Sequence, residues 1–378
     1  MNIAFGKPMI DKKEIMRVVS TLRGPQLVHG RQTKKFEDCF VDFVGGGYAT
    51  SLSSCTAGLH LSYKALGISK GDEVIIPALT HVATAHSVEY VGAKPVFIDS
   101  EIRTGNLNLD LIEKKINLRT KAICVVHYLG MPIDMTKILN LVKKYKLYLI
   151  EDCALALGAK YKKKHVGLFG DVASFSFYPV KHITTAEGGM LLSKNKIIVE
   201  KIKKLKAFGY DKSLNDRKVP GKYNVNYLGY NFRMNEIEAA IGIEQMKKLP
   251  NFLKKRKENM LKLRNLIKFK DINFMYEEKE DFLHANYCAL IILEKKLAPK
   301  RDLVIKKLIK KKIGCSIYYP GPIPFLNFYK NKYNFDINEF KNSKILSNNS
   351  IALPVGPHLS PTNMNTIVRR LREVIEDL

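Results

Sequence analysis

The chain has few cysteines, and none of them are paired by spacing. Only six occur in 378 residues, and no two are separated as Cys-x-x-Cys. In a chain of this length such a pattern fits neither a disulfide framework nor a zinc-binding motif. We therefore predict no metal site, and we expect most of the cysteines to be small buried apolar side chains.

Long apolar runs are also missing. No stretch approaches the roughly 18 apolar residues that a membrane-spanning helix requires. The first residues, MNIAFGKPMIDKKEI, reach charged side chains before any apolar segment develops, which is unlike a secretory signal. We expect a cytoplasmic protein with no membrane partner.

Acidic residues are scarce relative to basic ones. The sequence has 36 Asp and Glu against 63 Lys and Arg, a formal net charge of +27. Such a balance favours an anionic partner. However, the basic clusters are scattered, mostly on the solvated faces of helical patterns, at 162–164, 201–206, 254–257 and 306–312. With no basic tail and no known motif, we predict no nucleic-acid partner, whereas a small anionic substrate fits this charge.

Apolar strand-like runs and helical patterns alternate between residues 50 and 195. The predicted strands are 73–77, 94–98, 121–126, 147–151, 173–177 and 189–192, and the predicted helices are 56–66, 82–91 and 135–145. Strands separated by helices indicate a three-layer α/β fold with a largely parallel sheet and ligands at the carboxyl ends of its strands.

The second part of the chain changes character. Asn235 and Glu238 mark the start of a long helix that we expect to end at Pro250. We place there the end of a large α/β domain, residues 1–250, followed by a smaller α+β domain, residues 251–378. In the latter we predict strands at 282–293 and 313–319, a helix at 302–312 and a terminal helix after Pro361. Packing of the N-terminal segment on the smaller domain is compatible with this division.

Lys181 differs from the many other lysines in its setting. It follows the predicted strand ending in SFSFYP and precedes TTAEGG, where Gly188 and Gly189 allow tight passage of the backbone. An amine at the carboxyl end of a strand can have its pKa lowered by desolvation and act as a nucleophile. The local sequence leaves open the alternative that Lys181 is an ordinary solvated charge.

Two further features suit a phosphorylated cofactor. Asp152 ends the apolar strand LYLIED, where a carboxylate either caps the next helix or keeps a pyridine nitrogen protonated, as pyridoxal phosphate (PLP) requires. The segment SSCTAG opens a predicted helix, whose free N–H groups either bind an anion or are capped in the ordinary way. Ser176, five residues before Lys181, can add a hydroxyl donor to the same phosphate.

These features lie within a longer pattern. The segments SSCTAGLHLSYKALG, LIEDCALALGAKY, GDVASFSFYPVKHITTAEGGM and GYNFRMNEIEAAIGIEQMKKL follow one another along the chain. Together they closely resemble the DegT/DnrJ/StrS family of PLP-dependent sugar aminotransferases, from about Phe5 to the C-terminal helix. The resemblance implies the fold type I architecture of PLP-dependent transferases, PLP as cofactor and a homodimer with shared active sites.

The resemblance also assigns roles to single residues. Lys181 would hold PLP as a Schiff base and move a proton between the amino acid and the cofactor, and Asp152 would pair with the pyridine nitrogen. Asn231 would reach the cofactor phosphate of the neighbouring subunit. Three residues would hold the phosphate within the subunit: Cys55, Thr56 and Ser176.

Three positions need separate comment. His81 stands where the family usually places an aromatic ring that stacks on the cofactor, although a buried core histidine is the alternative. Leu155 occupies the place of a Gln or His that commonly bonds the cofactor's phenolic oxygen, so that donor is missing. After Tyr319 the sequence reads PGPIP and lacks the histidine of a Tyr-x-Pro-Leu-His-like pattern, which leaves the substrate contacts there unassigned.

The segment 185–189, Thr-Ala-Glu-Gly-Gly, resembles that of the family's sugar 4-aminotransferases. We predict transfer of an amino group from glutamate to a nucleoside-diphosphate 4-keto-6-deoxyhexose, giving a 4-amino-4,6-dideoxy sugar for surface polysaccharide, lipopolysaccharide O-antigen or glycan. The alternatives are a 3-aminotransferase, a sugar 3-dehydratase, which has histidine in place of the lysine, and a non-catalytic regulator on the same fold.

Overall fold

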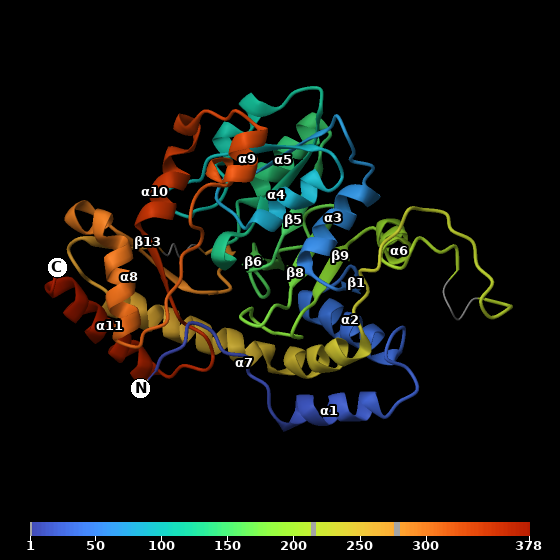
Figure 1. Ribbon diagram of the computed structural model, residues 1–378, viewed down its shortest axis with the longest axis horizontal. Coiled ribbons are helices and arrows are strands. Elements are labelled where there is room, and N and C mark those ends of the chain that lie inside the picture. Colours follow the sequence, from blue (N-terminus) through green and yellow to red (C-terminus); the bar gives the residue numbers. More distant parts are fainter. Residues whose placement is uncertain (1, 213–216, 276–279) are drawn as a thin grey trace.

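The computed structural model describes residues 2–212, 217–275 and 280–378 (Figure 1). Within these residues a seven-stranded sheet forms the centre of the larger part of the molecule. In spatial order its strands are β1 (Tyr48–Leu52), β9 (Gly189–Ser193), β8 (Val172–Ser176), β5 (Tyr148–Asp152), β4 (Thr120–Val126), β2 (Glu73–Pro77) and β3 (Lys94–Ile98). From β8 to β3 all neighbours are parallel, and β9 is antiparallel to both of its neighbours. The predicted, largely parallel α/β sheet is confirmed.

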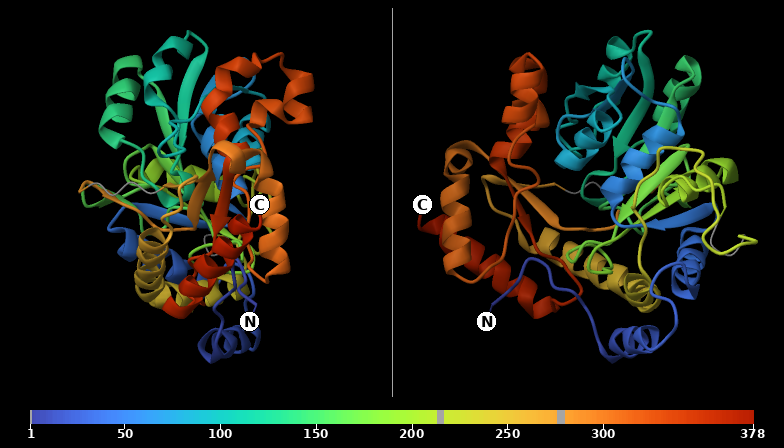
Figure 2. Two further views of the ribbon diagram at one scale, coloured as in Figure 1. Left: turned by 90° about the vertical axis from the view of Figure 1, so that its left-hand side faces the viewer. Right: turned by 45° about the vertical axis from the view of Figure 1, so that its right-hand side comes forward.

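Helices cover both faces of this sheet, as Figure 2 shows. The helices that follow its strands are α3 (Cys55–Ala65), α4 (Val82–Glu89), α5 (Met135–Tyr145) and α6 (Lys196–Leu205). On β4, Cys124 belongs to one buried cluster with Leu59 of α3, whereas Ile123 belongs to another with Ile138 of α5. Successive side chains of a strand point to opposite faces, so this alternation builds the three layers and confirms the predicted helices to within about two residues.

The helix that begins after Asn235 is longer than predicted. The Asn235–Glu238 capping box is present, but α7 (Glu236–Leu266) runs through Pro250 and does not end there. A proline inside a helix costs about 3 kcal/mol because one hydrogen bond is lost. Buried apolar side chains on both sides favour continuation: Phe252 packs in the core of the large sheet, and Leu263 packs in the core of a second, smaller sheet. One helix therefore serves both cores, and the division of the chain at residue 250 stays a prediction.

The smaller sheet is antiparallel, with the order β10 (Ile272–Met275), β12 (Ala289–Leu293) and β13 (Ser350–Leu353). It is accompanied by α8 (Arg301–Lys310), α10 (Lys341–Asn349) and α11 (Pro361–Glu376). The predicted terminal helix is confirmed, and its apolar face is buried at Met364, Ile367, Val368, Leu371 and Val374.

The strand predicted at 282–293 is interrupted. Its first part, β11 (Phe282–Leu283), pairs with β6 (Lys160–Tyr161), which also pairs with β7 (Lys164–His165), while its last part is β12. Between them the chain crosses the end of the large sheet, where the N–H of Ala285 donates to the carbonyl of Gly130 (2.9 Å). These bonds replace a strand ladder over 284–288 and bring Tyr287 toward the large sheet.

The strand predicted at 313–319 is also wrong. The N–H of Gly314 donates to the carbonyl of Ile3 (2.7 Å), whereas Ser316 bonds with Ala352 of β13. Because the partner changes within three residues, no continuous ladder forms. The same contacts place Ile3 in the core of the smaller sheet, so the N-terminal segment does pack there.

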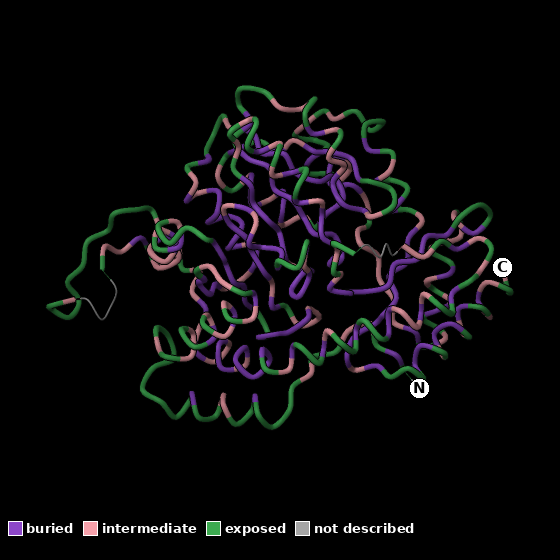
Figure 3. Tube along the Cα trace, turned by 180° about the vertical axis from the view of Figure 1, so that it is seen from behind, coloured by how far each residue is buried: buried purple, intermediate pink, exposed green. Residues whose placement is uncertain are grey.

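Two helices near the N-terminus were not predicted. They are α1 (Lys12–Leu22) and α2 (Arg31–Val44), and both pack along α7 (Figure 1). Figure 3 shows that much of α1 is exposed. A further short helix is α9 (Asn327–Lys332). No helix in the described ranges has the length and apolar character needed to cross a membrane.

Candidate functional site

Lys181 lies in a tight turn after β8, at the carboxyl edge of the parallel strands. Its N–H donates to the carbonyl of Tyr178 (2.9 Å). Burial lowers the pKa of its amine below 10.5, and the nearby Cys55 thiol and Asp152 carboxylate oppose that shift. Among the described residues no carboxylate lies within ion-pair distance (4.0 Å) of this amine. Lys181 is therefore a desolvated amine, and within the described residues it has no paired carboxylate that would hold the proton on it. Both features favour the unprotonated form that a nucleophile requires.

Asp152 is the last residue of β5 and is 5% exposed. Its Oδ2 accepts a hydrogen bond from the Thr84 hydroxyl (2.8 Å), and its Oδ1 accepts one from the N–H of Ala154 (3.1 Å). Thr84 in turn contacts the hydroxyl of Thr80 (2.9 Å). The carboxylate is thus held in one orientation beside Lys181. Sequence reasoning missed Thr84, because a single threonine within a helical pattern carries no signal of such a contact.

The start of α3 is the candidate anion site. Ser54 is the N-cap, and its hydroxyl accepts from the N–H of Ala57 (3.0 Å). The first N–H groups of a helix have no acceptor within the helix, and the helix dipole favours an anion there. Cys55 and Thr56 provide these groups. The Cys55 thiol itself is inert, because burial and then the Asp152 carboxylate raise its pKa.

The end of β8 lies against this helix start. Ser176 pairs with Gly189 of β9, and Ser54 bridges Gly188. A Cβ on Gly189 would stand 2.4 Å from the carbonyl carbon of Ser54 and 2.6 Å from the nitrogen of Cys55. The missing side chain of Gly189 therefore allows the end of β8 to lie directly against the α3 N-terminus, and the role of Ser176 at a phosphate stays a prediction.

We expect Gly189→Ala to weaken PLP binding at least about tenfold, since over-packing costs roughly 1–3 kcal/mol and would displace the 54–55 turn. Titration of the protein with PLP, followed by absorbance, measures this. Gly321→Ala is the matched control, because a Cβ at Gly321 meets nothing within 4 Å. Equal affinity of Gly189→Ala and the wild type would show that this turn takes no part in binding.

His81 lies near Lys181 and packs against Tyr319. His81 caps α4 through Nδ1, which accepts from the N–H of Ala83 (3.2 Å), and its ring lies edge-on to Tyr319 at 5.8 Å. Desolvation and then the charge of Lys181 lower the pKa of His81 below 6.5. The ring is therefore neutral near pH 7, which suits stacking on a flat cofactor. Leu155 is buried with Tyr128 and offers no side-chain donor, as the sequence indicated.

Asn231 stands apart from these residues. It is exposed, and its Oδ1 accepts from Nε of Arg233 (3.0 Å), while Arg233 also contacts His29 (2.9 Å). In the described part of the chain no hydrogen bond links Asn231 to Lys181, Asp152 or the α3 start. Its predicted role at a neighbouring subunit stays a prediction.

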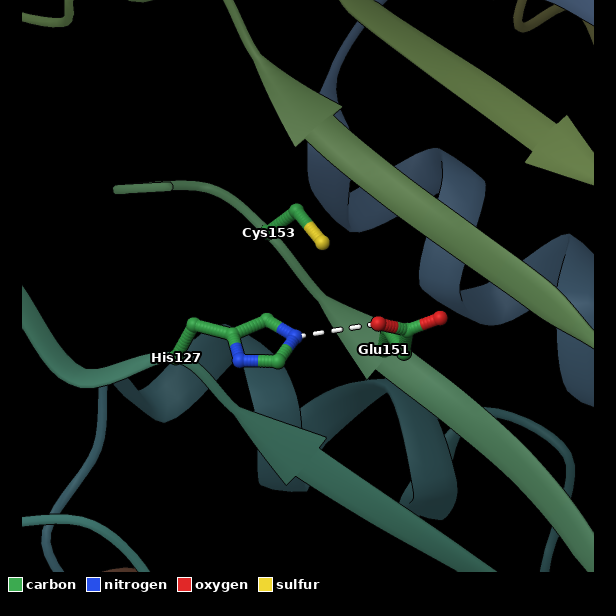
Figure 4. Close-up of side chains that lie close together, drawn as sticks. All are labelled: His127, Glu151 and Cys153. Carbon is green, nitrogen blue, oxygen red and sulfur yellow. Dashed lines mark hydrogen bonds and ion pairs between the residues drawn. The ribbon is translucent and has the colours of Figure 1, made fainter. Parts of the chain in front are cut away.

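Behind the site three buried side chains lie close enough to hold a metal ion: His127, Glu151 and Cys153 (Figure 4). The Glu151 carboxylate is already occupied, because it accepts from Nε2 of His127 (3.1 Å) and from the N–H groups of Gly167, Phe169 and Gly170 (2.6–2.9 Å). His127 Nδ1 accepts from the N–H of Ile133 (3.2 Å), which assigns the proton to Nε2. His127 and Glu151 therefore act as a hydrogen-bonded clamp that ties residues 167–170 to the end of β5.

This clamp predicts acid-sensitive stability. Burial alone would raise the pKa of Glu151, but the hydrogen bonds from His127 and the loop outweigh it and hold the pKa below 4.5. The carboxylate therefore stabilises the fold fully above about pH 4.5, and this contribution is lost as pH falls through the lowered pKa. We expect Glu151→Gln to lower the free energy of unfolding by about 1–3 kcal/mol at pH 7. In acid, where the wild-type carboxylate also becomes protonated, we expect the difference in this free energy between the variant and the wild type to become smaller.

Urea unfolding at pH 7 and in acid measures the effect, with exposed Glu258→Gln as control. A difference between Glu151→Gln and the wild type that is independent of pH would contradict a role for the charge.

Together these groups fit PLP. The α3 start, which packs directly against Gly189, has N–H groups without an acceptor in the helix, and a buried carboxylate is fixed by Thr84. A desolvated amine completes the set. The α3 start would bind the phosphate of PLP, Asp152 would pair with its ring nitrogen, and Lys181 would react with its aldehyde.

Comparisons with known proteins agree with this site. The profile of the DegT/DnrJ/EryC1/StrS aminotransferase family matches residues 8–372. GDP-perosamine synthase of Escherichia coli O157:H7 is 36% identical over 92% of this chain and 91% of its own. UDP-4-amino-4-deoxy-L-arabinose–oxoglutarate aminotransferase of Shewanella sediminis is 31% identical over 98% of this chain and 97% of its own.

Among solved structures, the protein Spr1654 of Streptococcus pneumoniae in its PMP-form superimposes with a TM-score of 0.94 at 28% identity, covering 100% of both chains. The same protein is also known in a PLP-form. The predicted fold class, the prediction of an aminotransferase and the predicted cofactor are confirmed. The chain belongs to the DegT/DnrJ/EryC1/StrS aminotransferase family of PLP-dependent enzymes.

Proposed function

We propose that this protein transfers the amino group of glutamate to C4 of a nucleoside-diphosphate 4-keto-6-deoxyhexose, giving a 4-amino-4,6-dideoxy sugar for surface polysaccharide or glycan. The observation that carries an amino-transfer role is the placement of Lys181, Asp152 and the α3 start at one edge of the sheet. The two half-reactions alternate, so that the amino acid leaves before the sugar enters.

Each residue has a distinct task. Bound PLP supplies an electron sink for the bond that breaks at the substrate carbon. Asp152 holds a proton at the pyridine nitrogen, and Thr84 keeps its carboxylate aimed. Cys55, Thr56 and Ser176 bind the phosphate, and the neutral ring of His81 orients the cofactor plane. Lys181 holds the cofactor between turnovers and moves the proton at the reacting carbon.

The position of amination has two supports. Residues 185–189 read Thr-Ala-Glu-Gly-Gly, the pattern that resembles the family's 4-aminotransferases. The relative from Shewanella sediminis is named for a 4-amino-4-deoxy sugar and for oxoglutarate, the product that glutamate leaves after donating its amino group. We extend both features to this chain as its substrate class and donor.

A 3-dehydratase is a weaker alternative. That activity needs a histidine in place of the lysine, and the nearest one, His182, is 3% exposed with its Nε2 on the carbonyl of Ala285 (3.0 Å). Burial lowers the pKa of His182 well below 6.5. It is thus fixed in the core, away from the role of a catalytic base.

The test is to incubate the protein with PLP, glutamate and a panel of nucleotide-linked 3-keto and 4-keto sugars, and to follow the products by mass. An amine from a 4-keto sugar supports the proposal, whereas an amine from a 3-keto sugar overturns the assignment of position. Deoxygenation without retained nitrogen indicates the dehydratase, and no product from any 4-keto sugar contradicts the proposed substrate class.

We also propose a homodimer with shared sites. Four apolar side chains on α1 are exposed to 40% or more: Ile15, Met16, Val19 and Leu22. Such an apolar stripe on one helix is typical of an interaction surface. Asn231, exposed and held by Arg233, is available to a second subunit.

Mixing two inactive variants tests the sharing directly. If Asn231 serves the neighbouring subunit, a heterodimer of Lys181→Ala and Asn231→Ala contains one intact site, so activity returns when the dissociated subunits are reassociated together. Each variant reassociated alone is the control. If Asn231 serves its own subunit, the mixture stays as inactive as the two parents.

A further inference from the structure

Arg256 of α7 is a buried cation without an anion. It is 5% exposed, and within the described ranges it makes no ion pair. Its Nη1 donates to the carbonyl of Tyr287 (2.8 Å) and its Nη2 to the carbonyl of Lys181 (3.4 Å), while its Nε has no partner. Burial lowers the pKa of Arg256 to about 10. A buried charge without a counter-ion is costly. Here the Arg256 guanidinium links the main chain at Lys181 to that at Tyr287.

Tyr287 is the residue on which two cations converge. The Lys181 Nζ lies 5.5 Å from the centre of its ring, and the Arg256 guanidinium carbon lies 6.0 Å from it. Both distances are within the range of a cation–π contact. The Tyr287 side chain is 3% exposed, and its hydroxyl bonds with that of Tyr318 (2.7 Å). The ring is therefore fixed at the hydroxyl by Tyr318 and at the backbone by Arg256.

The cation–π contact favours one protonation state of Lys181. The face of an aromatic ring carries partial negative charge, so it stabilises an ammonium and leaves a neutral amine almost unaffected. Burial acts in the opposite direction, and the Asp152 carboxylate acts in the same direction as the ring. The groups that face Lys181 from the elements around it are Cys55, His81, Asp152, His182, Arg256 and Tyr287.

We propose that Tyr287 is a positioning residue that holds the protonated form of the Lys181 amine on its ring. Arg256, which bonds to the main chain at both residues, holds the ring and the lysine in place relative to one another. This rests on the proposed function in one respect only, that Lys181 is the residue that moves the proton. The proton stays on the lysine long enough to be delivered back to the substrate because the ring stabilises the ammonium in an otherwise desolvated site.

The test measures the pKa of Lys181 in the protein without cofactor. The protein is treated with trace acetic anhydride over a range of pH, and acetylation at Lys181 is quantified by peptide mass spectrometry. Tyr287→Leu is expected to lower the pKa of Lys181 by about one unit, whereas Tyr287→Phe keeps the ring and the pKa. Tyr287→Met is the second variant if Tyr287→Leu does not fold. Tyr161→Leu, a buried tyrosine of β6 in another core cluster, is the control.

Arg256 is tested by coupling. If it holds the ring in place, Tyr287→Leu shifts the pKa of Lys181 much less in an Arg256→Gln background than in the wild type. Additive shifts overturn the role of Arg256, and an unchanged or raised pKa in Tyr287→Leu overturns that of Tyr287. Because no sugar or cofactor is present, these outcomes stay distinct from a failure of the proposed amination.

Discussion

Lys181→Ala is expected to abolish amino transfer, with kcat falling by at least about 10⁴-fold, because the variant loses both the covalent link to PLP and the proton carrier. Lys181→Arg is expected to fail equally, since a guanidinium keeps the charge but is always protonated. The product amine, followed by mass, measures the loss. The variants should still bind PLP through the α3 start and Asp152, but without the absorbance of cofactor linked to the protein.

Lys194→Ala, at an exposed lysine just after β9 and at the opposite edge of the sheet, is the control for a general effect of removing a lysine. Borohydride reduction of the wild type should trap the cofactor on the peptide that contains Lys181. Trapping on a different peptide, or an active Lys181→Ala protein, would contradict the assignment of this lysine.

Asp152→Asn is the second change with a large expected effect. The amide keeps the shape of the side chain and an acceptor for Thr84 but carries no charge, so the pyridine nitrogen of PLP loses the partner that keeps it protonated. Removing one such fixed electrostatic contact costs roughly 10²- to 10³-fold in kcat. Steady-state kinetics with glutamate measures the change, and PLP titration shows whether binding survives.

Thr84 provides the matched comparison for Asp152. Thr84→Ser keeps the hydroxyl that donates to Asp152, whereas Thr84→Val removes it and keeps the shape. We expect Thr84→Val to lose about tenfold in kcat and Thr84→Ser to stay near the wild type. Wild-type kcat in Asp152→Asn would contradict the role of the carboxylate, whatever the behaviour of the Thr84 variants.

The parallel sheet could be predicted from the sequence because its pattern is local. Buried runs such as β2 and β3 are bounded by helical periods, and the loops that follow them carry polar residues. Most of the candidate site could likewise be predicted from the sequence, since Lys181 and Asp152 stand at strand ends whose direction the fold class determines. The roles assigned to them came from the family resemblance, because a single lysine or aspartate does not reveal its chemistry locally.

The remaining features depend on tertiary contacts. The passage of α7 through Pro250 follows from two cores that one helix must serve, and residues 313–319 form no strand because their partner changes from Ile3 to Ala352. Thr84, Arg256 and Tyr287 reach the site from segments far apart in the sequence. No periodicity or spacing marks them.

We propose that this protein moves nitrogen from glutamate to C4 of a nucleotide-linked keto-sugar. The most direct test supplies glutamate labelled with heavy nitrogen, PLP and a nucleoside-diphosphate 4-keto-6-deoxyhexose, and locates the label in the product by NMR. We predict heavy nitrogen bonded to C4 with the wild type and none with Lys181→Ala. A 4-keto sugar left unlabelled while a 3-keto sugar offered in its place takes up the label would contradict the proposed position of amination.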